Sequence, residues 1–280
     1  MRGRGYIYSI IILLADVLLT PFVGGILALI AVIYALVLGE WLGRQKMGAI
    51  ACDSLSGRNK QKLSSCFERV KTKVEQESKH VSKRVKVYYI PSDEINAYAF
   101  GWRSIGVTAG TLNLDNKTVE TLIAHEYGHL VNGDAVLNMV LMVNALGIVT
   151  ILASYQFVFL VMIYLFILFA YLIGMMRFSF LSYFISNKII EGIRAVGNFF
   201  RLVVLRLCEI LICLVGRKGE LLADGYACKL GYGFYLQNFL TRYAQDRQIH
   251  GFIDVLYRTH PAKELRIANL SRVLERRQIG

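Results

Sequence analysis

Two histidines and a glutamate are spaced for metal-dependent hydrolysis in the segment IAHEYGH, residues 123–129. In a helix, His125 and His129 lie on one face because residues four apart are neighbours there, so both imidazoles can bind one ion. Glu126 follows the first histidine and can take a proton from water at that ion. Zinc suits such ligands and lowers the pKa of bound water towards ~7, so that a carbonyl can be attacked. The alternative is a helix that carries two histidines without a metal.

A catalytic zinc site needs a third protein ligand, usually a histidine or a carboxylate. The chain continues LVNGD after His129, so the third histidine of the HExxHxxGxxH pattern is missing. The segment RKGELLADGYA offers Glu220 instead, with Asp224 four residues later on the same helix face. Glu220 can bind the metal, and Asp224 can accept a hydrogen bond from the outer nitrogen of a ligand histidine. The alternative is a solvated pair of acids on a surface helix.

Five further polar residues are candidates for less certain roles. Asn96 lies in a predicted strand ahead of the zinc helix, where an extended edge could bind a substrate peptide by strand addition or could simply pack in a sheet. His260 precedes a proline at a predicted helix start and could donate to an oxyanion or cap the helix. The same choice is open for Arg266. Asn132 and Asp134 continue the zinc helix and are interpreted as structural.

The composition indicates a membrane protein. Of the 280 residues, 55% are hydrophobic and the mean hydropathy is +0.45, whereas soluble domains are nearer 45–50% apolar. The net charge of +12 is interpreted as basic loops that face anionic lipid, and no nucleic-acid-binding motif is present. The five cysteines include no Cys-x-x-Cys pair, so we expect reduced thiols rather than a zinc ribbon or a disulfide framework.

Two apolar stretches are candidates for membrane spans. The first is interpreted as a hairpin of helices at Tyr6–Leu19 and Phe22–Leu38, with one tilted span or a cleaved signal peptide as alternatives. Basic residues flank both of its ends, which favours a cytosolic position for both. The second, Val136–Met176, has 41 residues, about twice the number that crosses ~30 Å of hydrocarbon. We therefore predict two spans with a turn near Ser154–Gln156, which leaves both halves of the zinc site on one side.

The segment Phe199–Gly216 is apolar but contains Arg201, Arg206 and Glu209. Three charges disfavour a span, so a buried or interfacial helix is predicted, with a fifth span as the alternative.

The remaining pattern predicts an α+β fold: a zincin-like domain with a small sheet and the HExxH helix, combined with about four transmembrane helices. An amphipathic helix is expected at Asn59–His80, followed by strands at Val85–Ile90, Ile95–Trp102 and Ser104–Thr111. Caps at Leu114–Asn116 begin the zinc helix. Four units are predicted. Residues 1–40 form a first transmembrane hairpin, and residues 41–135 form the first half of the protease domain. Residues 136–177 form a second transmembrane hairpin, and residues 178–280 form the mainly helical second half of the protease domain.

These motifs resemble those of the HtpX-type membrane zinc metalloproteases, relatives of the CAAX prenyl proteases. The resemblance rests on HEYGHLVNGD and RKGELLAD, supported by the basic N-terminal hairpin, INAYAFG and THPAKELRIANL, and it covers most of the chain. It implies that His125, His129 and Glu220 are zinc ligands, that Glu126 is the general base and that Asp224 supports a ligand. The sequence departs from the family pattern at two places, the short loop of the N-terminal hairpin and the segment Ser179–Gly216.

The resulting hypothesis is an integral membrane zinc endopeptidase with its catalytic domain on the cytosolic side. By resemblance, its substrates are misfolded or membrane proteins and its role is quality control and stress response. A prenyl-protein protease with the same chemistry is one alternative. A membrane scaffold without catalysis is another, which the intact Glu126 disfavours because structural zinc needs no base.

Overall fold

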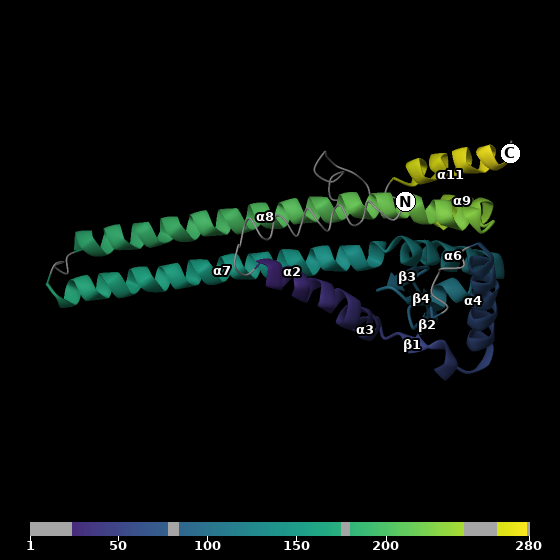
Figure 1. Ribbon diagram of the computed structural model, residues 1–280, viewed down its shortest axis with the longest axis horizontal. Helices are drawn as coiled ribbons and strands as arrows, with labels where there is room; N and C mark the ends of the chain where they lie inside the picture. The colour runs from purple at the N-terminus through teal and green to yellow at the C-terminus, as the bar shows by residue number, and fades with distance from the viewer. Residues whose placement is uncertain (1–23, 78–83, 175–179, 244–261, 279–280) are drawn as a thin grey trace.

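The computed structural model describes residues 24–77, 84–174, 180–243 and 262–278. These residues form a compact region of helices and strands, and a long helical arm that projects from it (Figure 1). The compact region contains a small sheet with helices packed against it, while the arm consists of two antiparallel helices. The prediction of a largely helical fold with a small sheet is therefore confirmed.

A four-stranded mixed sheet lies in the compact region, with the strand order β1-β2-β4-β3. Strands β2 and β4 are parallel, and the other two pairs are antiparallel, so β3 lies at an edge of the sheet. The strands are β1 (Ile50–Ala51), β2 (Lys86–Ile90), β3 (Ala97–Phe100) and β4 (Ser104–Thr108). The three predicted strands correspond to β2, β3 and β4, although the last predicted residues belong to the short helix α5 (Ala109–Leu112).

Helix α4 (Gly57–Glu77) packs against α6 and the sheet through one apolar face. The spacing of its apolar residues predicts this amphipathic helix, and the structure confirms it because the residues that form the face are all buried: Leu63, Phe67, Val70 and Val74. They join residues of the sheet and of α6 in one hydrophobic core. This core holds α6 in a fixed position beside the sheet.

Helix α6 (Asn116–Asn132) carries the HEYGH segment and has a defined start and end. The Asp115 side chain caps its N-terminus by accepting a hydrogen bond of 3.0 Å from the Thr118 N–H. Gly133 ends the helix with a left-handed φ of 77°, and its N–H bonds to the His129 carbonyl. The end of α6 therefore lies directly beside the second histidine, and the chain turns there into the arm.

The arm is a hairpin of other segments than predicted. The predicted turn within residues 136–177 is wrong. Helix α7 (Asp134–Leu172) runs without interruption through Ser154–Gln156, where a turn was expected. That segment contains neither proline nor glycine, so nothing in it interrupts the helical hydrogen bonds. The helix ends just before Gly174, which has a left-handed φ of 71°. The hairpin is instead formed by α7 and the following helix α8 (Phe180–Lys229), which packs along it (Figure 1).

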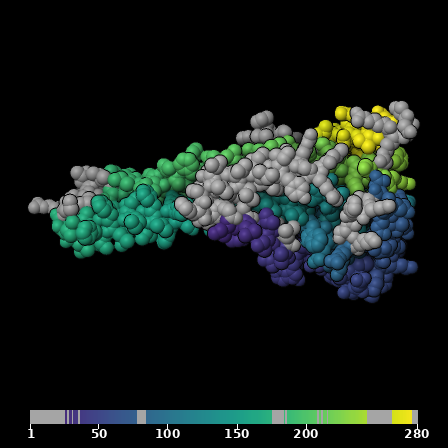
Figure 2. All heavy atoms as spheres, viewed as in Figure 1, coloured from purple at the N-terminus to yellow at the C-terminus, as the bar shows by residue number. Residues whose placement is uncertain are grey.

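The predicted boundary at residue 178 does not separate the arm from the compact region. Helix α8 begins in the arm and ends in the compact region. The ambiguous segment Phe199–Gly216 is the middle of this helix. Its Arg206 and Glu209 form an exposed ion pair of 2.8 Å. Among the described residues, α7 alone is a helix long and apolar enough to cross a membrane. Figure 2 shows how far the arm projects from the compact region.

A third helical segment packs against the base of the arm. It consists of α2 (Gly24–Ile33), a π-helical stretch η1 (Tyr34–Leu38) and α3 (Gly39–Lys46), which follow one another without a break. Helix α2 and η1 contact α7, and α3 contacts β3. The predicted helix at residues 22–38 thus extends to Lys46, whereas the predicted helix at residues 6–19 lies outside the described residues.

Two helices complete the compact region on the other side of α6. They are α9 (Gly233–Tyr243) and α11 (Lys263–Gln278), which pack against each other and against α8. Helix α6 is therefore enclosed by the sheet and α4 on one side, and by α8 and α9 on the other.

Candidate metal centre and active site

Helices α6 and α8 cross closely at the HEYGH segment because a glycine separates its histidines. A Cβ atom on Gly128 would lie 2.7 Å from the Cα atom of Ala223 on α8, which is closer than two such atoms can approach. The missing side chain thus lets the backbones of the two helices touch. Ala223 lies between Glu220 and Asp224 in the sequence, so this contact brings both acids to the histidines on α6.

Three donor atoms converge from these helices, two imidazole nitrogens and one carboxylate. The Nε2 atoms of His125 and His129 are 3.3 Å apart. The Glu220 carboxylate lies 3.4 Å from the first and 3.6 Å from the second. Tetrahedral zinc with bonds of ~2.0–2.1 Å separates its ligand atoms by roughly 3.3–3.4 Å, so this donor set fits a zinc ion. Two histidines and one glutamate are also a ligand set found in catalytic zinc sites.

Each histidine has a second acid at its outer nitrogen. The Nδ1 atom of His125 lies 3.0 Å from a carboxylate oxygen of Asp224, which is fully buried. The Nδ1 atom of His129 lies 3.4 Å from a carboxylate oxygen of Asp134, in the first turn of α7. Such partners favour the tautomer that leaves Nε2 free for a metal. Asp134 was interpreted as structural, but the structure puts it at the site, on the side where the arm begins.

Arg266 of helix α11 holds both acids of α8 together. Its Nη1 atom lies 2.8 Å from Glu220, and its Nε and Nη2 atoms donate to Asp224 at 2.9 and 2.6 Å. The two parallel hydrogen bonds to Asp224 are the bidentate arrangement for which the planar guanidinium is suited. Arg266 thereby connects the C-terminal helix to the donor set, although α11 follows α8 by more than thirty residues.

The charges at the site shift the pKa values of its carboxyl and imidazole groups. Burial raises the pKa of Glu126, while the nearby His129 and His125 oppose this effect. Burial also tends to raise the pKa of Asp224, but hydrogen bonds to His125 and Arg266 outweigh it and lower that pKa. Burial lowers the pKa of His129, but hydrogen bonds to Asp134 and Glu220 reverse this and raise it to about 10. The acids therefore favour positive charge at the centre of the site.

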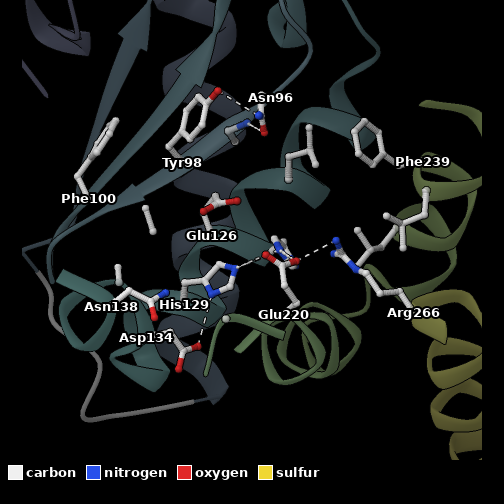
Figure 3. A pocket seen from close by; sticks show the side chains of 18 of the residues that line it. Asn96, Tyr98, Phe100, Glu126, His129, Asp134, Asn138, Glu220, Phe239 and Arg266 are labelled. Carbon is white, nitrogen blue, oxygen red and sulfur yellow. Dashed lines mark hydrogen bonds and ion pairs between the residues drawn. The ribbon is translucent and has the colours of Figure 1, made fainter. Parts of the chain in front are cut away.

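Glu126 and the two histidines line a cavity of about 430 Å³ (Figure 3). The edge strand β3 lies along one side of the cavity, which Glu126 also lines. Three apolar residues of α9 line the cavity too: Leu236, Phe239 and Leu240. Asn138 lines it near the base of the arm. The cavity thus lies between the donor set, the edge strand β3 and the apolar residues of α9.

Comparison with known proteins agrees with this geometry. Residues 58–274, more than three quarters of the chain, match Peptidase family M48. The chain belongs to peptidase family M48. This confirms the predicted membership of a metallopeptidase family. The M48 match includes both halves of the donor set and the whole arm between them.

Among solved structures, the M48 chain is similar to the crystal structure of Ste24p from S. mikatae, with a TM-score of 0.49 and 17% sequence identity. The match covers 86% of this chain and 56% of that one, so the chain spans little more than half the length of this relative. The search of curated proteins gives no match.

In this M48 chain, the structure brings together five of the seven residues proposed from sequence: His125, Glu126, His129, Glu220 and Asp224. Asn96 immediately precedes β3 and lines the same cavity, with its amide donating to the Tyr98 hydroxyl at 3.0 Å. His260 lies outside the described residues. Sequence analysis interpreted Asp134 as structural, although a carboxylate five residues after the second histidine is a signal for a role at the site. It left the role of Arg266 open and did not predict its contacts with Glu220 and Asp224.

Proposed function

We propose that the chain is a zinc-dependent endopeptidase that is anchored in a membrane and cleaves polypeptide chains. One observation carries this proposal: the Nε2 atoms of His125 and His129 and the carboxylate of Glu220 converge within 3.6 Å, beside Glu126 and a cavity under a free sheet edge. The metal donors, the base and a place for substrate are thus adjacent. A structural zinc site would need neither the base nor the cavity.

His125, His129 and Glu220 would hold the zinc ion, which supplies Lewis acidity that acidifies water and polarises a carbonyl. Glu126 then accepts a proton from the attacking water and returns it to the leaving nitrogen of the cleaved peptide bond. Its raised pKa suits both transfers, since a base whose pKa is nearer neutrality can also act as an acid. Asp224 and Asp134 hold the imidazoles in the required orientation, and Arg266 holds Glu220 and Asp224.

The substrate is proposed to add to strand β3 as a fifth strand. The Asn96 carbonyl accepts a hydrogen bond from the Thr108 N–H of β4, so the backbone groups of Ala97 and Ala99 point to the opposite, free side of β3. The Ala97 N–H bonds to the Asn96 side-chain oxygen at 2.9 Å, so a peptide displaces this bond when it pairs with β3, whereas Ala99 lines the cavity together with Glu126. A peptide paired with these groups is held next to the donor set by its backbone, without demands on its sequence.

The side chains around the cavity favour one class of substrate. Antiparallel pairing, the more stable kind, places the N-terminal part of the peptide near Phe100 and its C-terminal part near Asn96. Figure 3 shows that Phe239 lies beyond the Asn96 end, whereas Asn138 lies beyond the Phe100 end. The residue after the cleaved bond would thus contact Leu236, Phe239 and Leu240. We infer a preference for a large apolar residue at that position, as found in unfolded or membrane polypeptides.

The arm supports a location in a membrane. Helix α7 has no charged residue after Asp134, and most of its large apolar side chains between Tyr155 and Leu172 are exposed. At 1.5 Å per residue its 39 residues extend for about 58 Å, more than the ~30 Å of hydrocarbon in a bilayer. Because α8 returns along α7, both halves of the donor set lie at the same end of the arm. Arg44 and Lys46, in the last turn of α3 at this end of the arm, favour the cytosolic side for it.

Zinc content and proteolysis test the proposal together. The full chain is purified in detergent, its metal is measured by mass spectrometry, and its cleavage of fluorescein-labelled casein is followed. We expect about one zinc per chain, and activity that is lost with a chelator and restored by zinc. Glu126→Gln should keep the zinc and lose the activity. Zinc-loaded wild type that cleaves neither casein nor a membrane protein would contradict the proposal and favour a scaffold, while cleavage of prenylated peptides alone would favour a prenyl-protein protease.

A further inference from the structure

Glu40 is a buried acid far from the donor set, at the junction between the N-terminal helical segment and the sheet. It lies in the first turn of α3, and only 5% of its surface is exposed. Its Oε1 atom accepts a hydrogen bond of 2.6 Å from the Ser104 hydroxyl and lies 3.5 Å from Arg103. Its Oε2 atom is buried and has no hydrogen-bond partner among the described residues. The side chain thus connects α3 to the first residue of β4.

A helix cap does not explain this acid. The backbone of Leu38 and Gly39 is helical, so η1 continues into α3 and leaves no free N–H groups for Glu40 to satisfy. Burial of a carboxylate with one oxygen unpaired is costly, and an apolar residue of similar size would often be more stable there. The π-helical stretch just before Glu40 contains one extra residue per turn, which changes the face that the following side chains present. Both features favour a role in function over one in stability.

The turn that Glu40 contacts ends the proposed substrate-binding strand. Ser104 is paired with Phe100, the last residue of β3, which directly follows Ala99 in the sequence. The turn is tightly packed against α3: a Cβ atom on Gly101 would lie 2.9 Å from the Cβ atom of Glu40. A Cβ atom on Gly43, one turn further along α3, would lie 3.1 Å from the Phe100 ring. The position of this end of β3 is thus set by α3.

We propose that Glu40 is a positioning residue that fastens the edge strand β3 to the helix α2–η1–α3, so that the free side of β3 faces Glu126. This inference rests on the proposed function, because it concerns how the substrate-binding strand is held. Glu40 touches neither the donor set nor the cavity. Its loss should therefore weaken substrate binding and leave the chemical step and the metal unaffected.

Glu40→Met tests the proposal, since methionine keeps the length of the side chain and removes its hydrogen bonds. The full chain in detergent should show a KM for labelled casein raised about tenfold, as expected for loss of a buried hydrogen bond to a charged group. Its kcat should stay within about twofold and its zinc content should be unchanged. Glu40→Gln can still accept from Ser104 and should restore KM to within about threefold of wild type. Glu120→Met, at another buried glutamate, is the matched control and should not raise KM.

A KM for Glu40→Met equal to that of wild type would overturn the proposal, whatever happens to its melting temperature. Hydrogen–deuterium exchange gives a second measurement that needs no cleavage. In the zinc-loaded protein, the amides of residues 97–104 should exchange about tenfold faster in Glu40→Met than in wild type or Glu40→Gln. Unchanged exchange would also overturn it. Failure of wild type to cleave any substrate would instead reject the proposed function and leave the exchange result to decide on Glu40.

Discussion

Two glutamates on helix α6 are both buried, but they lie in opposite surroundings. Glu120 is 1% exposed and bonds to Arg69, to Lys117 at 3.1 Å and to the Tyr232 hydroxyl at 3.1 Å. Glu126 is 8% exposed and faces the cavity, with two histidines as its nearest basic groups. Six residues on a helix place the two side chains roughly 120° apart, so α6 presents one to the core and one to the site.

The difference shows how one helix can be anchored and reactive at once. Burial would raise the pKa of Glu120, but the hydrogen bonds from Lys117 and Arg69 outweigh it and keep this pKa below its usual value. For Glu126 burial is not outweighed, so its pKa is raised. The first carboxylate is fixed in its charged form and holds α6 to α4. The second is left able to bind and release a proton, which is the property that a general base needs.

The largest expected effect is the difference in kcat/KM when Glu126 and Glu120 are each replaced by glutamine. Glu126→Gln should lower kcat/KM for casein about a thousandfold or more, because no group replaces the proton acceptor. Glu120→Gln should leave kcat/KM within about threefold, since it acts only on the packing of α6. Initial rates at equal zinc occupancy measure both. Equal losses in the two variants would mean that Glu126 acts through stability, and the comparison would fail.

A smaller effect is expected at the acids that support the histidines. Asp224→Asn should weaken zinc binding about 10- to 100-fold, measured by competition with a chelator, because an amide no longer favours the required imidazole tautomer. Asp134→Asn should have a weaker effect, since Asp134 lies farther from its histidine and is less buried. Excess zinc should restore much of the activity in both. If Asp134→Asn proved the more damaging, the relative importance inferred from these distances would be wrong.

The smallest effect concerns stability and its dependence on pH. Glu120→Gln should lower the free energy of unfolding by about 2 kcal/mol at pH 7, the value of a hydrogen bond to a charged group. Because the folded pKa of Glu120 is lowered from 4.5, its ionised form stabilises the protein fully above pH 4.5, and this contribution is lost as the pH falls through the folded pKa. Melting temperatures of wild type and variant should converge over that range. A constant difference at low pH would show that charge is not involved.

The sequence predicts those parts of the molecule that depend on local periodicity. Residues four apart on a helix share a face, which suffices to pair His125 with His129 and Glu220 with Asp224. The same rule predicts the buried face of α4. Chemistry then connects the two pairs, because two histidines need a third ligand and an outer partner. The geometry agrees with this reasoning, and the zinc ligation itself stays a prediction.

The contacts and boundaries that sequence analysis did not predict depend on packing between distant segments. Arg266 reaches Asp224 from 42 positions away, and an isolated arginine gives no local sign of such a contact. The continuity of α7 was missed for a different reason. An apolar run of that length has the same composition whether it turns once or not at all, and its end depends on Gly174 and on packing against α8. Length alone therefore predicted a turn at the wrong place.

The unbroken course of helix α8 limits how the arm can change in evolution or by design. A single helix joins the far end of the arm to Glu220, so each residue inserted into it rotates one end against the other by about 100°. After an insertion of one or two residues, one of two contacts would be lost. Either the side of α8 that packs on α7 would turn away from α7, or Glu220 would turn away from the histidines. Insertions of seven residues leave a mismatch of only about 20°. Arms of different length should therefore differ by heptads, matched by equal changes in α7.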